Sequence, residues 1–204
     1  MTSLPKIQAV IFDIGNVLIT WAPERYYDRV YGQDRRRALF ADLDLHEMND
    51  QIDRGADFKD TIYAWADANP EWRREIRDWH DHWLTMAGPP IEGSIACLRA
   101  LRAKGMPVFA LSNFGIGSFA ITEVHWPVLT EFDRRYISGH MKTAKPDAAI
   151  YAMVEADCAI DPRGLLFIDD RPENIAAAAA RGWQTHLFDG PGPLRARLEH
   201  EGLL

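Results

Sequence analysis

The sequence contains few cysteines, no long apolar run and fewer basic than acidic residues. Cys97 and Cys158 are the two cysteines, and each lies in an apolar helical pattern with no CxxC spacing. This usage argues against a disulfide framework or a zinc site and favours reduced thiols in the core. No apolar stretch reaches about 18 residues, so we expect no membrane-spanning helix and a cytoplasmic location.

The charge and composition of the chain limit the kinds of ligand and partner that it is expected to bind. Lys and Arg number 23 against 30 Asp and Glu, which gives a formal charge of −7. A general nucleic-acid binder needs a basic face to displace phosphate counterions, so this balance argues against one. With 47% apolar and 26% charged residues among 204, the chain has the composition of a globular domain with a modest insert. We expect a small-molecule ligand, no nucleic acid, no membrane, and either a monomer or a homodimer.

Four apolar runs of strand length alternate with helical patterns. The runs lie at 7–12, 107–111, 164–168 and 184–188, and the helical patterns lie at 91–104, 146–156 and 173–181. Gly105 and Gly182 suit the ends of two of these helices, and Pro146 suits the first turn of another. The alternation predicts an α/β fold in which a parallel sheet is covered by helices on both faces.

The stretch from 21 to 89 has a different pattern, with no convincing strand. Trp72, Ile76, Trp79 and Trp83 recur at helical spacing, which predicts a single stripe on one helix. We therefore expect an all-helical insert after the first strand. Core packing is the expected role of the stripe, with lining of a substrate entrance or a dimer contact as the alternatives.

Polar residues gather where the predicted strands end. This edge of an open parallel sheet is where ligands bind. The residues are, in chain order, Asp13, Ser112, Asn113, Lys145, Asp169 and Asp170. Carboxylates that converge at one edge repel each other unless a cation lies between them, and oxygen ligands favour Mg²⁺. A hydroxyl and an ammonium group at the same edge would complete a phosphate cradle.

Four segments in this order resemble the motifs of the haloacid dehalogenase-like hydrolase superfamily. They are VIFDIGNVLIT, ALSN, the Lys145–Pro146 pair and LFIDDRPEN, and together they extend over essentially the whole chain. The resemblance implies a three-layer, doubly wound parallel sheet at 1–20 and 90–204, with a helical cap inserted at 21–89. The FDIGNV and DDRPEN forms are most similar to the bacterial branch that contains sugar-phosphate phosphatases, among them glucose-1-phosphate phosphatases.

The resemblance also implies roles for individual residues in a Mg²⁺-dependent phosphatase. Asp13 would be the nucleophile that attacks phosphorus and forms an aspartyl-phosphate. Lys145 would keep Asp13 ionised and bind the phosphate, with which Ser112 and Asn113 would also interact. The expected substrate is a small phosphorylated metabolite such as a sugar phosphate.

The same resemblance implies a Mg²⁺ site made of oxygen ligands. Asp13 and Asp170 would bind the ion directly, and Gly15 would offer its backbone carbonyl. Asp169 and Asn174 would lie behind these ligands and orient them.

Gly15 marks a departure from the family's phosphatases, which usually carry a second Asp two residues after the nucleophile. That Asp protonates the leaving oxygen, a contribution on the order of 10²- to 10⁴-fold that glycine cannot make. Three hypotheses follow. The enzyme prefers leaving groups that need little protonation, or another residue such as Asp169 or His125 substitutes, or dephosphorylation is slow.

Two other functions stay open, and a third is disfavoured. True haloacid dehalogenases also lack the second Asp and use no metal, but they typically have Ser and Asn at the positions of Asp169 and Asp170. A non-catalytic member that binds a phosphorylated ligand has Gly15 as its only support. The GIGSFA segment at 115–120 matches a dinucleotide-binding pattern, but no clean second strand ends in an acid about twenty residues later.

Overall fold

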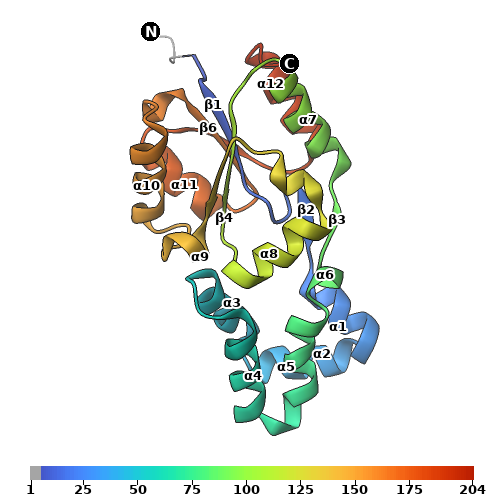
Figure 1. The fold of residues 1–204 in the computed structure, drawn as a ribbon. Coiled ribbons are helices and arrows are strands. Elements are labelled where there is room, and N and C mark those ends of the chain that lie inside the picture. Colours follow the sequence, from blue (N-terminus) through green and yellow to red (C-terminus); the bar gives the residue numbers. More distant parts are fainter. Residues whose placement is uncertain (1–5) are drawn as a thin grey trace.

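A five-stranded parallel sheet forms the centre of the computed structural model, which describes residues 6–204 (Figure 1). The strand order is β5-β4-β1-β6-β7, and each pair of neighbours is parallel. The strands are β1 (Ala9–Phe12), β4 (Val108–Ser112), β5 (Arg134–Ile137), β6 (Leu165–Asp169) and β7 (Gln184–Leu187). The chain builds outward from β1 on one side through β4 and β5, then crosses to build the other side through β6 and β7.

Alternate side chains of β1 are buried against opposite faces of the sheet. Val10 and Phe12 join one apolar cluster, and Ala9 and Ile11 join the other. Helices α7 (Glu92–Ala103) and α12 (Pro191–His200) contribute to the first of these clusters. Helices α10 (Ala148–Cys158) and α11 (Pro172–Ala180) contribute to the second. Because both faces are covered, the predicted α/β class and doubly wound sheet are confirmed.

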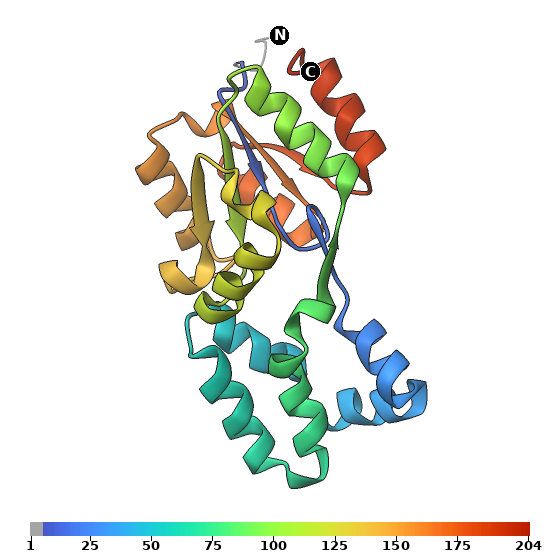
Figure 2. The same ribbon diagram turned by 45° about the vertical axis from the view of Figure 1, so that its right-hand side comes forward.

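The cap is a lobe of helices beyond the carboxyl ends of the strands (Figures 1 and 2). Its elements are α1 (Pro23–Tyr31), α2 (Gln33–Asp42), α3 (Leu45–Asp53), α4 (Phe58–Ala68), the 3-10 turn η1 (Pro70–Trp72), α5 (Arg73–Asp81) and α6 (Trp83–Met86). It lies against α8 (Ile116–His125) and α9 (Ser138–Met141) of the core. Further 3-10 turns are η2 (Pro127–Thr130) and η3 (Pro162–Gly164).

Two strands connect the cap to the core, and the expectation of no strand between 21 and 89 is wrong at both ends. β2 (Ile19–Trp21) pairs antiparallel with β3 (Ala87–Pro90), with Ile19 opposite Pro90 and Trp21 opposite Ala87. The sequence AGPP has little strand propensity, so this pairing depends on contacts distant in sequence. The division of the chain at 20/21 and 89/90 stays a prediction.

Smaller features complete the comparison with the sequence. β5 was not predicted because it begins with the exposed Arg134 and Arg135 and carries no apolar run. Pro146 precedes α10 instead of opening it, since that helix begins at Ala148. Both cysteines are free and buried, as predicted. No helix in the described part of the chain is long and apolar enough to cross a membrane.

Candidate active site

The site begins at the turn that follows β1. Asp13 comes directly after this strand, at the point where the strand order changes direction and ligands of open α/β sheets bind. Asn16, three residues on, has the left-handed backbone (φ 54°) that Asn tolerates better than most residues. Its Oδ1 accepts a hydrogen bond from the Trp21 backbone N–H at 2.9 Å, and its Nδ2 donates to Asp170 Oδ2 at 3.2 Å. Asn16 therefore ties the first motif to the last one and to the start of the cap, a role the sequence analysis missed.

Asp13 is buried and strongly hydrogen bonded through one oxygen. Its Oδ1 accepts from the Ile14 backbone N–H at 2.7 Å, from Ser112 Oγ at 2.7 Å and from Lys145 Nζ at 2.9 Å. No residue among 6–204 donates a hydrogen bond to Oδ2, which leaves that oxygen for a cation or a substrate. Burial raises the pKa of Asp13 to about 7 against the opposing charge of Lys145, so a further cation is needed to keep it fully ionised at neutral pH.

Lys145 is the buried cation of the site, with a side chain that is 1% exposed. Besides Asp13, its Nζ donates to Asp169 Oδ2 at 2.7 Å and to the Leu111 carbonyl at 2.9 Å. Burial opposes the charged ammonium, but the two carboxylates outweigh it and raise the pKa of Lys145. Its three N–H donors are all used, so it is fixed beside the nucleophile position and would have to exchange one partner to bind a phosphate.

Asn113 positions Lys145 through the backbone. Its Oδ1 accepts from the Lys145 N–H at 2.8 Å, and its Nδ2 donates to the Lys145 carbonyl at 2.9 Å. Both polar ends of the side chain are thus engaged in holding the lysine loop. Any direct contact of Asn113 with phosphate would have to come from its backbone or after this clamp opens.

Asp169 lies behind the other acids, fully buried. Its Oδ1 accepts from the Arg171 backbone N–H at 2.8 Å, its Oδ2 accepts from Lys145, and Asn174 Nδ2 lies 3.0 Å from both oxygens. With each oxygen taken by protein donors, Asp169 is suited to orient the site, and the roles of Asp169 and Asn174 stay predictions.

The acids at this edge fit a divalent cation. Carboxylate oxygens of Asp13, Asp169 and Asp170 all lie within 4.8 Å of one another. Burial, and then the charge of Asp169, raise the pKa of the half-buried Asp170, so this cluster disfavours its own ionisation. Mg²⁺ prefers a set of ligands made only of oxygen. The positive charge of a bound Mg²⁺ would favour the ionised carboxylates and so offset the cost of bringing them together.

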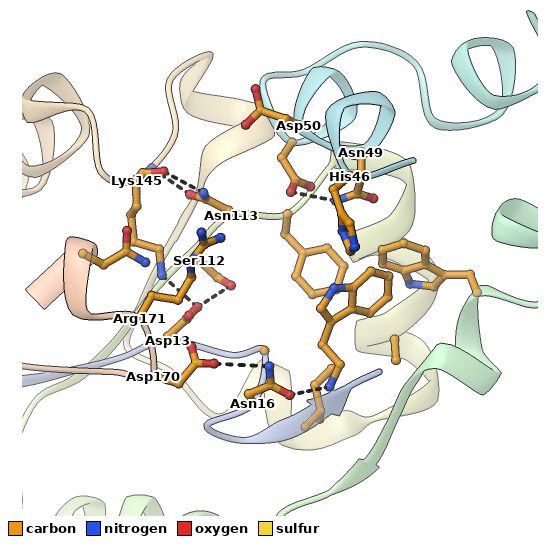
Figure 3. Close-up of a pocket in the computed structure, with 18 residues that line it drawn as sticks. Asp13, Asn16, His46, Asn49, Asp50, Ser112, Asn113, Lys145, Asp170 and Arg171 are labelled. Atoms are coloured by element: carbon orange, nitrogen blue, oxygen red, sulfur yellow. Dashed lines mark hydrogen bonds and ion pairs between the residues drawn. The ribbon is translucent and has the colours of Figure 1, made fainter. Parts of the chain in front are cut away.

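A cavity of about 420 Å³ lies between this edge and the cap, within the size range of small-ligand pockets. Asp13, Gly15, Asp170 and Asn174 line it on the core side together with Ser112, Asn113 and Lys145. Figure 3 shows Asp13, Asp170 and Asn16 on one side of it, and His46 and Asn49 on the other. The core residues singled out in the sequence thus lie together around this cavity, with Asp169 just behind the lining.

The cap wall of the pocket was missed. His46, Asn49, Asp50 and Asp53 line it from α3, at the spacing i, i+3, i+4 and i+7 of a single helical face. The opposite face of α3 carries the buried Leu45, Met48 and Ile52. This polar spacing was readable in the sequence, but a polar helix face ordinarily faces solvent.

An apolar wall completes the pocket, made of Ile19, Trp21, Trp83, Ala87 and Phe114. Among the residues of the tryptophan stripe, Ile76 and Trp79 are fully buried in the cap, whereas Trp83 lines the pocket and donates its indole N–H to Thr122 Oγ1 at 2.8 Å. The stripe is therefore not on one helix as predicted: Ile76 and Trp79 of α5 pack in the cap, as expected, and Trp83, the first residue of α6, lines the pocket.

Two glycines of the GIGSFA segment have a packing role. A Cβ on Gly115 would lie 2.3 Å from Ile52 Cγ2, and a Cβ on Gly117 would lie 3.0 Å from Phe58 Cβ. They let the cap helices α3 and α4 approach α8, where the sequence analysis had expected a close approach to phosphate.

Comparison with known proteins identifies the class of this chain. A family model described as haloacid dehalogenase-like hydrolase matches residues 7–182. The chain belongs to this hydrolase family, and the family predicted from the motifs is confirmed.

Two relatives of known name match most of this chain. The sesquiterpene phosphatase astK of Aspergillus oryzae is 25% identical over 198 residues, covering 89% of this chain and 90% of the relative. The drimenol cyclase drtB of Aspergillus calidoustus is 22% identical over 194 residues, and 89% of this chain matches only 34% of that longer protein. This chain therefore spans about a third of the cyclase.

Among solved structures, the HAD family enzyme BT-2542 of Bacteroides thetaiotaomicron shares the fold. Its TM-score is 0.73 at 24% identity, over 91% of this chain and 95% of that one. The same enzyme in complex with magnesium and inorganic phosphate has a TM-score of 0.69 at 22% identity, over 90% and 95% of the two chains.

Proposed function

We propose that this chain is a Mg²⁺-dependent phosphatase that forms an aspartyl-phosphate on Asp13. One observation carries the proposal: oxygens of Asp13, Asp169 and Asp170 meet within 4.8 Å at the floor of the pocket, beside the buried Lys145. Carboxylates gathered in a buried site are costly unless a divalent cation offsets their charge. The phosphatase among the relatives, and the neighbour crystallised with magnesium and phosphate, agree with this function.

Each residue of the site would have its own role in the reaction. Mg²⁺ held by Asp13, Asp170 and the Gly15 carbonyl would offset the charge of the phosphate. The carboxylate of Asp13 attacks phosphorus, and a new oxygen–phosphorus bond forms as the bond to the leaving oxygen breaks. Ser112 Oγ, now 2.7 Å from Asp13 Oδ1, is placed to donate to a phosphoryl oxygen instead. Water then hydrolyses the aspartyl-phosphate and releases phosphate.

The cap wall and the apolar wall of the pocket support a hydroxylated small molecule, such as a sugar phosphate, as the substrate. The α3 face offers an imidazole, an amide and two carboxyl groups, which would lose hydration without compensation against a hydrocarbon. Trp21 and Trp83 on the other wall would pack on the apolar face of a sugar ring. A terpenyl phosphate is the second candidate, favoured by this aromatic wall and by the sesquiterpene phosphatase relative.

The test is a phosphate-release panel of sugar, polyol, acyl and terpenyl phosphates, each with Mg²⁺ and with a chelator. We expect Mg²⁺-dependent release that the chelator abolishes and added Mg²⁺ restores. Release that survives chelation contradicts the Mg²⁺ site. Chloride release from a 2-haloacid without metal would support the dehalogenase, and binding of esters without turnover would support the non-catalytic alternative.

A further inference from the structure

The leaving oxygen lacks an evident proton donor on the core side of the pocket. Gly15 occupies the position where the family's phosphatases usually carry an acid, and the geometry excludes both substitutes suggested by the sequence, Asp169 and His125. Asp169 has its oxygens engaged by Lys145, Asn174 and the Arg171 N–H. His125 is exposed on α8, packs on Trp126 and is not among the residues that line the pocket.

A carboxyl group on the cap side lines the same pocket. Asp53, the last residue of α3, lines the same pocket as Asp13 and is only 9% exposed. Its Oδ2 accepts from Asn49 Nδ2 at 2.9 Å, and Asn49 Oδ1 in turn accepts from the Trp79 indole N–H at 3.1 Å. This short chain of hydrogen bonds fixes the carboxyl group from within the cap.

The end of α3 is also held firmly on the core. The Asp53 carbonyl accepts from Ser138 Oγ at 2.6 Å, and Arg54 forms an ion pair with Asp147 at 2.7 Å. Lys142 Nζ donates to the Gly55 carbonyl at 3.0 Å. Because these contacts all lie within three residues of Asp53, the carboxyl group is positioned relative to the core and not merely relative to the cap.

The surroundings favour the protonated form of this carboxyl group. The charged groups that influence it are Asp50 on its own helix, and Asp13 and Lys145 from the core, while the Gly115 backbone N–H at the start of α8 donates toward it. Burial is the main cause that raises the pKa of Asp53 to about 8, with the two other carboxylates adding to it. A neutral carboxylic acid in a catalytic pocket at neutral pH is a proton donor.

We propose that Asp53 is the general acid of the reaction, supplied by the cap in place of the acid missing at Gly15; this inference rests on the proposed phosphatase function. As Asp13 bonds to phosphorus and the phosphorus–leaving-group bond breaks, the Asp53 proton passes to the leaving oxygen. The resulting Asp53 carboxylate then takes a proton from the water that attacks the aspartyl-phosphate, which restores the acid. Protons and electrons balance over the two half-reactions.

The test compares Asp53→Asn with wild type on two phosphate monoesters, an alkyl phosphate with a poor leaving group and p-nitrophenyl phosphate with a good one. Asn keeps the shape and the hydrogen bonds to Asn49 and Gly115 but has no proton to give. We expect kcat/KM for the alkyl ester to fall on the order of 10²- to 10⁴-fold, and for the nitrophenyl ester less than about tenfold. Glu47→Gln, which removes an exposed carboxyl group from α3 away from the pocket, should change neither.

An equal loss on both esters, or no loss, would overturn the inference, because a structural role does not discriminate between leaving groups. A second measurement needs only wild type: with Asp53 as acid, kcat/KM depends weakly on leaving-group pKa across a series of esters, and a steep dependence overturns the inference. If wild type releases no phosphate from any ester with Mg²⁺, the proposed function itself fails, which is a separate result.

Discussion

The core wall and the cap wall of the pocket bury carboxyl groups in different ways. On the core wall, Lys145 binds both Asp13 and Asp169, and the neighbouring oxygens of Asp170 complete a site suited to a cation. On the cap wall, no Lys, Arg or His within residues 6–204 forms an ion pair with Asp53, whose side-chain partners are an amide and a backbone N–H. The pKa values of Asp13 and Asp53 are raised to about 7 and about 8, but of the two only Asp13 forms an ion pair with Lys145. At Asp53, burial outweighs the Gly115 N–H and the charge of Lys145, which favour its anion. The difference suits one carboxyl to be a nucleophile and the other an acid.

Asp13→Asn should have the largest effect, because it removes the nucleophile of the core wall and little else. We expect phosphate release to fall on the order of 10⁴-fold or more, with the fold intact. Colorimetric phosphate release checks the loss, and intact-protein mass spectrometry checks that the phosphoenzyme disappears. Asp189→Asn, at an exposed carboxyl group that does not line the pocket, is the control and should behave as wild type. Substantial residual turnover in Asp13→Asn would contradict the role of Asp13.

Lys145→Met should have the next largest effect, on stability. It leaves Asp13 and Asp169 buried without their cation, which costs about 3–5 kcal/mol in the free energy of unfolding. Urea denaturation without Mg²⁺ measures the change, and Lys104→Met at an exposed lysine is the control. A loss below about 1 kcal/mol would mean that the core carboxyls are already protonated in the folded protein.

The core wall could be predicted from the sequence and the cap wall could not, for a physical reason. Asp13 and Asp169 directly end or follow apolar strands, and parallel topology brings all such strand ends to one edge. The polar face of α3 carries no comparable signal, because its burial depends on how the cap docks. That docking is set by Gly115, whose missing Cβ admits Ile52, and by the pairing of β2 with β3. Strand ends are local in the sequence, whereas a docked helix face is a property of the assembled fold.

Asp53→Asn should stabilise the protein, and more at high pH than at low pH. The pKa of Asp53 is raised from 3.8 to about 8, so the folded state holds a proton that the unfolded chain has released. Its stabilising contribution is therefore fully present below the unfolded pKa and is lost as pH rises toward the folded pKa. We expect the advantage of Asn over wild type to grow by about 4 kcal/mol between pH 5 and pH 9.

Thermal unfolding across this pH range measures the gain, with Glu47→Gln as the matched control. A gain that is independent of pH would show that Asp53 is ionised when buried, and the contrast between the two walls would then fail. Stability gained where activity is lost is typical of a functional residue.

Gly15→Asp should restore activity to Asp53→Asn by moving the acid from the cap wall back to the core wall. Gly15 does not have a positive φ, and an added Cβ would meet only Trp21 Cβ at 3.7 Å, an ordinary contact, so the backbone and the Cβ position admit a side chain here. We expect the double variant to recover about 10- to 100-fold of the lost kcat/KM on the alkyl phosphate and almost nothing on p-nitrophenyl phosphate. Gly15→Asn in the same background has the same size but no acidic proton. If Gly15→Asn restores as much kcat/KM as Gly15→Asp does, the gain comes from packing, and an acid at position 15 does not replace Asp53.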